Sequence, residues 1–193
     1  MFTLWGITPE GFQAMEVALE LISGEVLYER VVQGLLLKAR RSLWIATANV
    51  KDCQVELDEG FRSIVEAFER LCQRGVDVRI LHSGVPSGSF LESLKEMGLA
   101  GRPNFAMRRC PRVHFKAIIV DDAWLHLGSA NLTGAGLGAK SPQRRNFEVG
   151  ILTADQRLIE RVARLFHEIW DGLRCEDCGR RNVCYVPLEE PAF

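Results

Sequence analysis

An α/β fold with a mixed central β-sheet is predicted by three features of the sequence. Short aliphatic, β-branched runs typical of buried strands alternate with stretches in which apolar residues recur at helical spacing. The chain shows no internal repeat, and its 193 residues, 47% of them hydrophobic, suffice for one core of ordinary size. Helices that alternate with buried strands around one core predict an α/β/α sandwich.

The N-terminal part of the chain predicts two helices and a strand. Thr8-Pro9 is typical of a helix start, because proline suits the first helical position, and Gly24 is a typical stop. We therefore expect residues 1–24 to form an N-terminal helical segment, with its helix over 8–22, then a helix over about 25–40 and a buried strand over 43–50.

The remaining elements follow the same alternation. Apolar residues from Phe61 to Cys72 recur at helical spacing, which places Cys72 in the core, and Gly75 ends that helix. Thr153 and Gln156 have the spacing of a capping box for a last helix. The expected elements are helices over 61–72, 90–97 and 153–170, strands over 76–81, 105–109, 113–120, 124–128 and 146–152, and a glycine-rich loop over 134–143.

The stretch VHFKAIIVDDAWLHLGSAN carries most of the chemistry that the sequence suggests. His114 and Lys116 are two residues apart, so on an extended strand both side chains project from the same face. An imidazole beside an ammonium group combines a nucleophile or proton carrier with an anion anchor, as attack on a phosphodiester requires. Ser129, after Gly128, adds a hydroxyl and backbone N–H groups that can hold phosphate oxygens.

This stretch resembles the HKD motif of the phospholipase D superfamily, His-x-Lys-x4-Asp-x6-Gly-Ser-x-Asn. All fixed positions are matched, by His114, Lys116, Asp121, Gly128, Ser129 and Asn131. Matching of every fixed position at fixed spacing is a highly specific signal. The order of elements is similar over about residues 25–170, so the resemblance implies a phospholipase D-like fold and a catalytic domain over about residues 25–172.

The resemblance also implies a mechanism that needs no metal. One motif histidine attacks phosphorus to form a phosphohistidine, and a second histidine protonates the leaving oxygen. Lys116, Ser129 and Asn131 would hold the phosphoryl oxygens. The sequence has a single His-x-Lys, so the second histidine must come from another copy of the chain, and a two-fold homodimer with one composite site follows.

Two acidic residues receive different roles. Asp121 is five residues from Lys116 and points to the opposite face of a continuous strand, so we expect it, like Gly128, to be structural. Glu148 begins an otherwise apolar strand and shares a face with Asn146. An acidic residue on the corresponding strand of the family hydrogen-bonds the motif histidine, and Asn146-x-Glu148 is similar to that element. An edge glutamate in solvent is the alternative.

The other histidines carry weaker signals. His126 has the opposite parity to Ser129, so a surface or packing role is expected. His167 shares a helix face with charged residues and is expected in solvent. His82 ends a strand beside a Gly/Ser loop and is a candidate to border the site.

Charge separates sharply along the chain. Residues 101–146 hold eight basic and two acidic residues, a local charge of +6, whereas the whole chain carries −1. These residues could be ordinary solvent-exposed arginines. The concentration of positive charge around the motif instead favours an anionic substrate. We expect the arginines of this segment to bind substrate, namely Arg109, Arg112, Arg144 and Arg145, with Arg102 and Arg108 as further members.

Three functions compete for this anion-binding site. Hydrolysis of nucleic-acid phosphodiesters is favoured by the basic segment, the small size and the lack of a membrane segment. A phospholipase or cardiolipin hydrolase is the alternative, because single-motif members of that kind also exist. A non-catalytic nucleic-acid-binding module is the third class, against which the intact His114/Lys116 pair argues.

The C-terminal segment over residues 173–193 carries a second motif. Cys175-x2-Cys178-Gly resembles a zinc knuckle, in which glycine permits the turn that aims two thiolates at one ion. With Cys184 only three ligands are local, and Cys110, Cys53, His167 or a group from another subunit would be the fourth. Structural zinc is favoured over an iron–sulfur cluster, and free thiols or a redox pair are the alternatives.

The sequence also favours a cytoplasmic protein. No apolar run approaches the ~18 residues needed to span a bilayer. MFTLWGITPEG lacks the features of a secretory signal, so the six cysteines are expected to be reduced.

Overall fold

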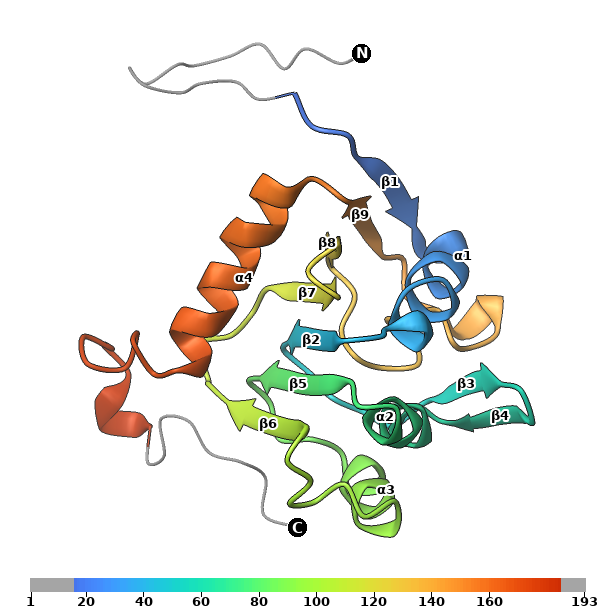
Figure 1. The fold of residues 1–193 in the computed structure, drawn as a ribbon, viewed down its shortest axis with the longest axis horizontal. Coiled ribbons are helices and arrows are strands. Elements are labelled where there is room, and N and C mark those ends of the chain that lie inside the picture. The colour runs from blue at the N-terminus through green and yellow to red at the C-terminus, as the bar shows by residue number, and fades with distance from the viewer. Residues whose placement is uncertain (1–15, 185–193) are drawn as a thin grey trace.

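The computed structural model describes residues 16–184 and contains a seven-stranded mixed sheet between two helical layers (Figure 1). The strand order is β1-β9-β8-β7-β2-β5-β6, in which β2, β5 and β6 are parallel and all other pairs are antiparallel. The predicted α/β sandwich with a mixed central sheet is therefore confirmed.

The strands of the large sheet are short and mostly buried. Their bounds are β1 Glu20–Ser23, β2 Ser42–Thr47, β5 Asp77–His82, β6 Phe105–Arg109, β7 Lys116–Val120, β8 Trp124–Gly128 and β9 Val149–Thr153. In β2 every residue except Trp44 is buried, because both faces of this central strand are covered by helices.

Helices lie on both faces of the sheet (Figure 1). On one face are α2 (Ile64–Gln73), α3 (Gly88–Glu96) and α1 (Gly24–Leu27), which continues into a π-helical segment, Tyr28–Gln33, and a 3₁₀ turn, Leu36–Lys38. On the other face is α4 (Gln156–Trp170), which buries Ile159, Phe166 and Trp170 against the sheet. Short 3₁₀ turns also occur at Pro142–Arg144 and Arg181–Val183.

The N-terminal helix expected over residues 8–22 is wrong in its last part. Residues 1–15 lie outside the described residues, but Glu20–Ser23 form β1, paired antiparallel with β9. Ile22 is fully buried whereas Leu21 is 74% exposed, an alternation typical of an edge strand. Pairing with β9, a tertiary contact, overrides the local helical pattern here.

The starts of two helices also differ from the sequence-based expectation. A hairpin of β3 (Gln54–Leu57) and β4 (Gly60–Ser63) precedes α2, so this helix begins at residue 64 and not at 61. Ser63 caps α2 by accepting a 3.0 Å hydrogen bond from the Val65 amide. The cap of α4 is Asp155, whose carboxylate accepts from the Arg157 and Leu158 amides, and not Thr153.

No helix within residues 16–184 is both long enough and apolar enough to cross a membrane.

Candidate active site

The sheet register brings the motif segments to one edge. Lys116 at the start of β7 pairs with Gly128 at the end of β8, and Gly128 pairs with Gly150 near the start of β9. On the other side of β7, Ala117 pairs with Ala46, so β2 ends at the same edge. Antiparallel pairing therefore places the segments before β7 and β9 beside the segments that follow β2 and β8.

His114 and Lys116 contact each other at this edge. The Lys116 ammonium group donates to the His114 carbonyl oxygen at 2.8 Å and lies 3.4 Å from Nδ1 of the imidazole. β7 begins at Lys116, so His114 belongs to the preceding loop and its side chain is exposed. The arrangement places an accessible imidazole and a fixed positive charge side by side.

Ser129 and Glu148 form a second polar pair at the same edge. The Ser129 hydroxyl donates to the Glu148 carboxylate, and the Val149 amide donates to Ser129 Oγ at 3.1 Å. Asn146 Nδ2 donates to the other carboxylate oxygen at 3.0 Å, so Asn146 and Glu148 lie on one side of the chain as expected. Resemblance to the family implied a bond from Glu148 to His114, but the carboxylate is bonded to Ser129 and Asn146 instead.

Gly128 is required by close packing of the strands. A Cβ at this position would lie 2.7 Å from the Val149 carbonyl oxygen, and one on Gly150 would lie 2.5 Å from Cε1 of His126. His126 is thus a packing residue, 2% exposed, under these two glycines. Its Nδ1 lies 3.1 Å from the Ile151 carbonyl oxygen, and burial lowers the pKa of the imidazole.

Asn131 fastens the loop after β8 to the end of β2. Its side-chain oxygen accepts hydrogen bonds from the Ala48 and Asn49 amides, both at 3.1 Å, and from the Thr47 hydroxyl at 3.3 Å. Thr47 in turn accepts from the Leu132 amide at 3.0 Å. Thr47 was not singled out from the sequence, because a buried threonine on a strand has no distinctive local signal.

Asp121 lies at the far end of β7 from Lys116. One carboxylate oxygen accepts from the backbone amides of Arg40, Arg41 and Ser42 at 3.1, 2.7 and 2.9 Å. The residue has a left-handed backbone, with φ +56°, as does Asp122 with φ +53°. This carboxylate therefore closes the turn before β2 and is remote from the imidazole.

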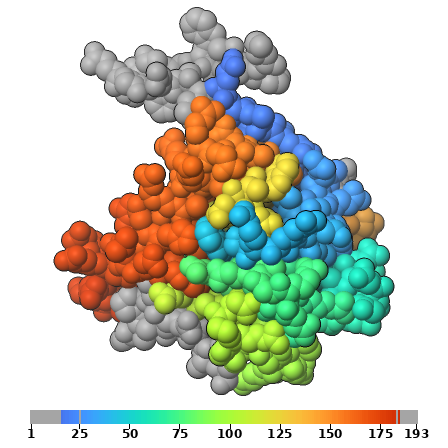
Figure 2. Space-filling view, in the orientation of Figure 1, coloured from blue at the N-terminus to red at the C-terminus, as the bar shows by residue number. Residues whose placement is uncertain are grey.

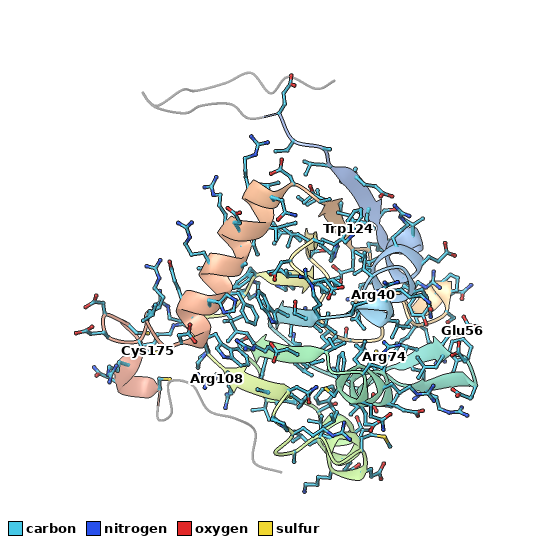
Figure 3. All side chains as sticks on the ribbon, in the orientation of Figure 1. Arg40, Glu56, Arg74, Arg108, Trp124 and Cys175 are labelled. Atoms are coloured by element: carbon cyan, nitrogen blue, oxygen red, sulfur yellow. The ribbon has the colours of Figure 1, made fainter. Side chains whose placement is uncertain are left out.

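The arginines of the basic segment divide into two groups. Arg102 is paired with Glu69 at 3.1 Å. Arg108, which Figure 3 labels on β6, stacks on Trp170, 5.1 Å from the ring centroid. Arg109 donates to the Ser83 carbonyl oxygen at 3.0 Å near the end of β5. The exposed members are Arg112 in the loop before His114 and Arg144 in the loop before β9, and Arg145 beside it is half-buried.

Two further histidines are covered to different extents. His82 is 1% exposed, with Nδ1 2.8 Å from the Gly84 carbonyl oxygen. The exposure expected for His167 is wrong, because its ring is half-buried and meets Trp44 edge-on at 4.4 Å. The aromatic side chain of β2 covers this part of α4, a contact invisible in the helical pattern.

The C-terminal segment after α4 brings its cysteines toward the loop before His114. Cys110, Cys175, Cys178 and Cys184 line one cavity, whereas Cys53 and Cys72 lie in the core. Hydrogen bonds from the Arg180 backbone and the Arg112 side chain lower the pKa of Cys178. Burial, with the three neighbouring thiols, raises the pKa of Cys175. Within residues 16–184, no three His, Cys, Asp or Glu side chains already form a metal-binding group.

A known protein family matches the part of the chain that forms strands β2 to β9 and the candidate site. A family model described as cardiolipin synthase, PLD-like domain, matches residues 32–170, well over half of the chain. The chain belongs to the phospholipase D superfamily. The match spans the sheet from β2 to β9 and ends with α4, so the cysteine segment lies outside it.

Individual proteins resemble this chain in sequence or in structure. Cardiolipin synthase A of Pseudomonas putida is 31% identical over 116 residues, which are 58% of this chain and 23% of that protein. The chain thus spans about a quarter of the length of this curated relative. Nuc from Salmonella typhimurium, a phospholipase D family member, has a TM-score of 0.61 at 17% identity and covers 92% of this chain and 100% of its own. NucT from Helicobacter pylori has a TM-score of 0.59 at 19% identity and covers 81% and 97%.

Proposed function

We propose that this member of the phospholipase D superfamily hydrolyses phosphodiester bonds of nucleic acids through a phosphohistidine. The observation that carries the proposal is the contact between Lys116 and an exposed His114, beside the Ser129–Glu148 pair on one sheet edge. In this proposal the exposed imidazole attacks the phosphate, and the ammonium group and the hydroxyl of the same sheet edge hold its oxygens.

The reaction proceeds in two displacement steps. The His114 imidazole forms a P–N bond while the P–O bond to the leaving group breaks, and a second imidazole protonates that oxygen. Water then attacks phosphorus, the second imidazole takes its proton, and the P–N bond breaks to release the phosphomonoester. These steps use no metal, so a brief EDTA treatment that preserves the fold leaves the rate of the chemical step unchanged when the substrate is saturating.

The second imidazole is His114 of a second copy of the chain. Phe147 and Val149, the sequence neighbours of Glu148, are 108% and 54% exposed, so two apolar side chains face solvent near this edge of the sheet. Exposed apolar groups beside a polar site favour a protein interface. A two-fold axis at this edge would cover both side chains and bring the two imidazoles to opposite sides of one phosphate.

Nucleic acid is proposed as the substrate because of the local charge. Residues 101–146 carry a charge of +6, and Arg112, Arg144 and Arg145 lie in the two loops that flank the strand edge. Several positive groups in flanking loops attract a polyanion. A substrate with a single phosphate group would need only the positive charge of the site itself. A cytoplasmic location remains a prediction.

A phospholipid substrate is the second candidate. It is supported by the description of the matching family, cardiolipin synthase, and by the same name of the Pseudomonas putida relative. The exposed apolar pair at the site is compatible with it, because a lipid bilayer would also cover Phe147 and Val149.

A substrate panel with one inactive variant tests the proposal. Purified protein and His114→Ala are assayed on single- and double-stranded DNA, RNA and cardiolipin-containing vesicles over a range of salt. We expect histidine-dependent cleavage of a nucleic acid, with binding that weakens steeply as salt rises. Cleavage confined to the vesicles would establish the phospholipid alternative, and salt-sensitive nucleic-acid binding without cleavage would establish a non-catalytic module.

A further inference from the structure

Four of the six cysteines surround one cavity beside the candidate active site. The cavity has a volume of about 320 Å³ and is formed by the loop between β6 and β7, the end of α4 and the segment that follows it. Cys110 comes from the loop, and Cys175, Cys178 and Cys184 come from the C-terminal segment. Figure 2 shows this segment, in red, projecting from the side of the molecule beyond α4.

We propose that Cys110, Cys175, Cys178 and Cys184 bind one zinc ion, which fastens the C-terminal segment to the loop that carries His114. Four thiolates in tetrahedral arrangement are a common closed ligand set of structural zinc. The sequence left the fourth ligand open among several groups, and the fold selects Cys110. Of the other candidates, Cys53 is in the core and His167 packs on Trp44.

The backbone of the segment turns at each cysteine. The Cys178 amide donates to the Cys175 carbonyl oxygen at 3.3 Å, the Arg181 amide to Cys178 at 2.9 Å, and the Cys184 amide to Arg181 at 3.2 Å. The Arg180 backbone also donates to the Cys178 sulfur. Successive tight turns with an amide directed at sulfur are also the backbone arrangement of a metal-binding knuckle.

The surroundings balance the charge of such a site. Zinc with four thiolates carries a net charge of −2, and the same cavity is lined by Arg112, Arg180 and Arg181, and by Arg174, which is already paired with Glu168. Arg112 already donates to the Cys178 sulfur at 3.4 Å. Leu165 and Ile169 of α4 form an apolar wall. Because no three ligands already meet among residues 16–184, binding requires the four sulfurs to turn inward to about 2.3 Å from the ion.

The metal would also order one side of the candidate site. A second cavity, of about 350 Å³, is lined by His114, Val113 and Ser83 together with Arg112 and Arg180. Arg112 lies between Cys110 and His114, and Arg180 lies between Cys178 and Cys184, so the ion would fix both guanidinium groups beside the imidazole. This consequence for substrate binding rests on the proposed function, whereas the metal site itself does not.

Elemental analysis of the full chain tests the metal site. Protein purified without chelators should contain about one zinc per chain, and Cys110→Ser and Cys178→Ser should each lose most of it. Cys72→Ser is the matched control, because it removes a thiol from the core and should retain the zinc. Wild type without zinc, or Cys110→Ser with its full zinc content, would overturn the proposal.

Thiol labelling of the wild-type chain gives a second measurement that needs no variant. The zinc-loaded protein is alkylated before and after removal of the metal with a chelator, and the labelled cysteines are located by mass spectrometry. We expect the chelator to expose Cys110, Cys175, Cys178 and Cys184 together, and added zinc sulfate to protect them again. Labelling of Cys110 that is the same with and without zinc would contradict the ligand set. Both readouts are obtained without substrate, so they are independent of the proposed hydrolysis.

Discussion

Lys116 is bound to the residue whose chemistry it is expected to support. Its ammonium group donates to the His114 carbonyl oxygen at 2.8 Å and lies 3.4 Å from Nδ1 of the same residue. The lysine thus fixes the loop that carries the imidazole and keeps a positive charge beside it. One side chain therefore has two roles, in positioning the imidazole and in stabilising an anion.

Replacement of His114 should separate activity from stability. His114→Ala removes the proposed nucleophile, so the rate should fall by at least about 100-fold. The side chain is exposed, so the free energy of unfolding should change by less than about 0.5 kcal/mol. Lys116→Ala should be similarly inactive. Steady-state kinetics and thermal denaturation measure the two effects.

Two variants serve as controls for His114→Ala and Lys116→Ala. His167→Gln and Lys38→Ala remove an imidazole and an ammonium group that lie outside the candidate site, and both should retain activity. A loss of less than about tenfold in His114→Ala is too small for a missing nucleophile and would refute its assignment.

Glu148 should act through its two hydrogen bonds. The carboxylate accepts from Ser129 and from Asn146, and an amide in its place keeps only one acceptor oxygen. Glu148→Gln should therefore lower kcat by about 10- to 100-fold through misplacement of Ser129. Glu160→Gln, an exposed position on α4, is the control. Equal kcat values for the two variants would show that Glu148 is an ordinary surface carboxylate.

Mixed dimers test whether one site uses two chains. If His114 of both chains is required, equal amounts of wild type and His114→Ala, exchanged to equilibrium, should lower the activity per wild-type chain by about half. Phe147→Asp should prevent association and activity together, as sedimentation and the cleavage assay can show. Activity that stays proportional to the amount of wild-type chain would exclude the composite site.

Asp121 should contribute to stability through the turn before β2. Asp121→Ala removes bonds to three consecutive amides and should lower the free energy of unfolding by about 1–3 kcal/mol in a denaturant titration. Asp122→Ala is the matched control, because its backbone has the same left-handed conformation. The additional loss of unfolding free energy in Asp121→Ala, relative to Asp122→Ala, measures the hydrogen bonds to the amides. Equal losses in the two variants would assign the destabilisation to backbone strain alone.

His126 should make the fold sensitive to acid. Burial lowers the pKa of its imidazole in the folded chain, so the unfolded chain binds the proton more readily. Stability should therefore fall as pH falls through the unfolded value of about 6.5, and level off below the lower folded value. His126→Asn, which keeps a donor for the Ile151 carbonyl, should flatten this slope in melting curves at different pH. An unchanged slope would assign the acid sensitivity to other groups.

The sequence by itself determined the fold class and showed which residues make up the motif. Aliphatic runs and helical spacing identified the central strands, because burial on both faces of a sheet leaves a local pattern. The motif from His114 to Asn131 has fixed identities at fixed spacing, so the family was recognisable without any contact being known.

Only the tertiary structure decided which of these residues meet. Glu148 pairs with Ser129, Asn131 fastens the end of β2, Glu20–Ser23 form a strand on β9, and Cys110 joins the C-terminal cysteines at one cavity. Each contact depends on strand register or on the path of a loop. Neither of these produces a periodic pattern of residues in the sequence. Arg102 and Arg112 look alike in the sequence, but one is paired with Glu69 and the other borders the His114 cavity, because packing and not composition sets the partners of a charge.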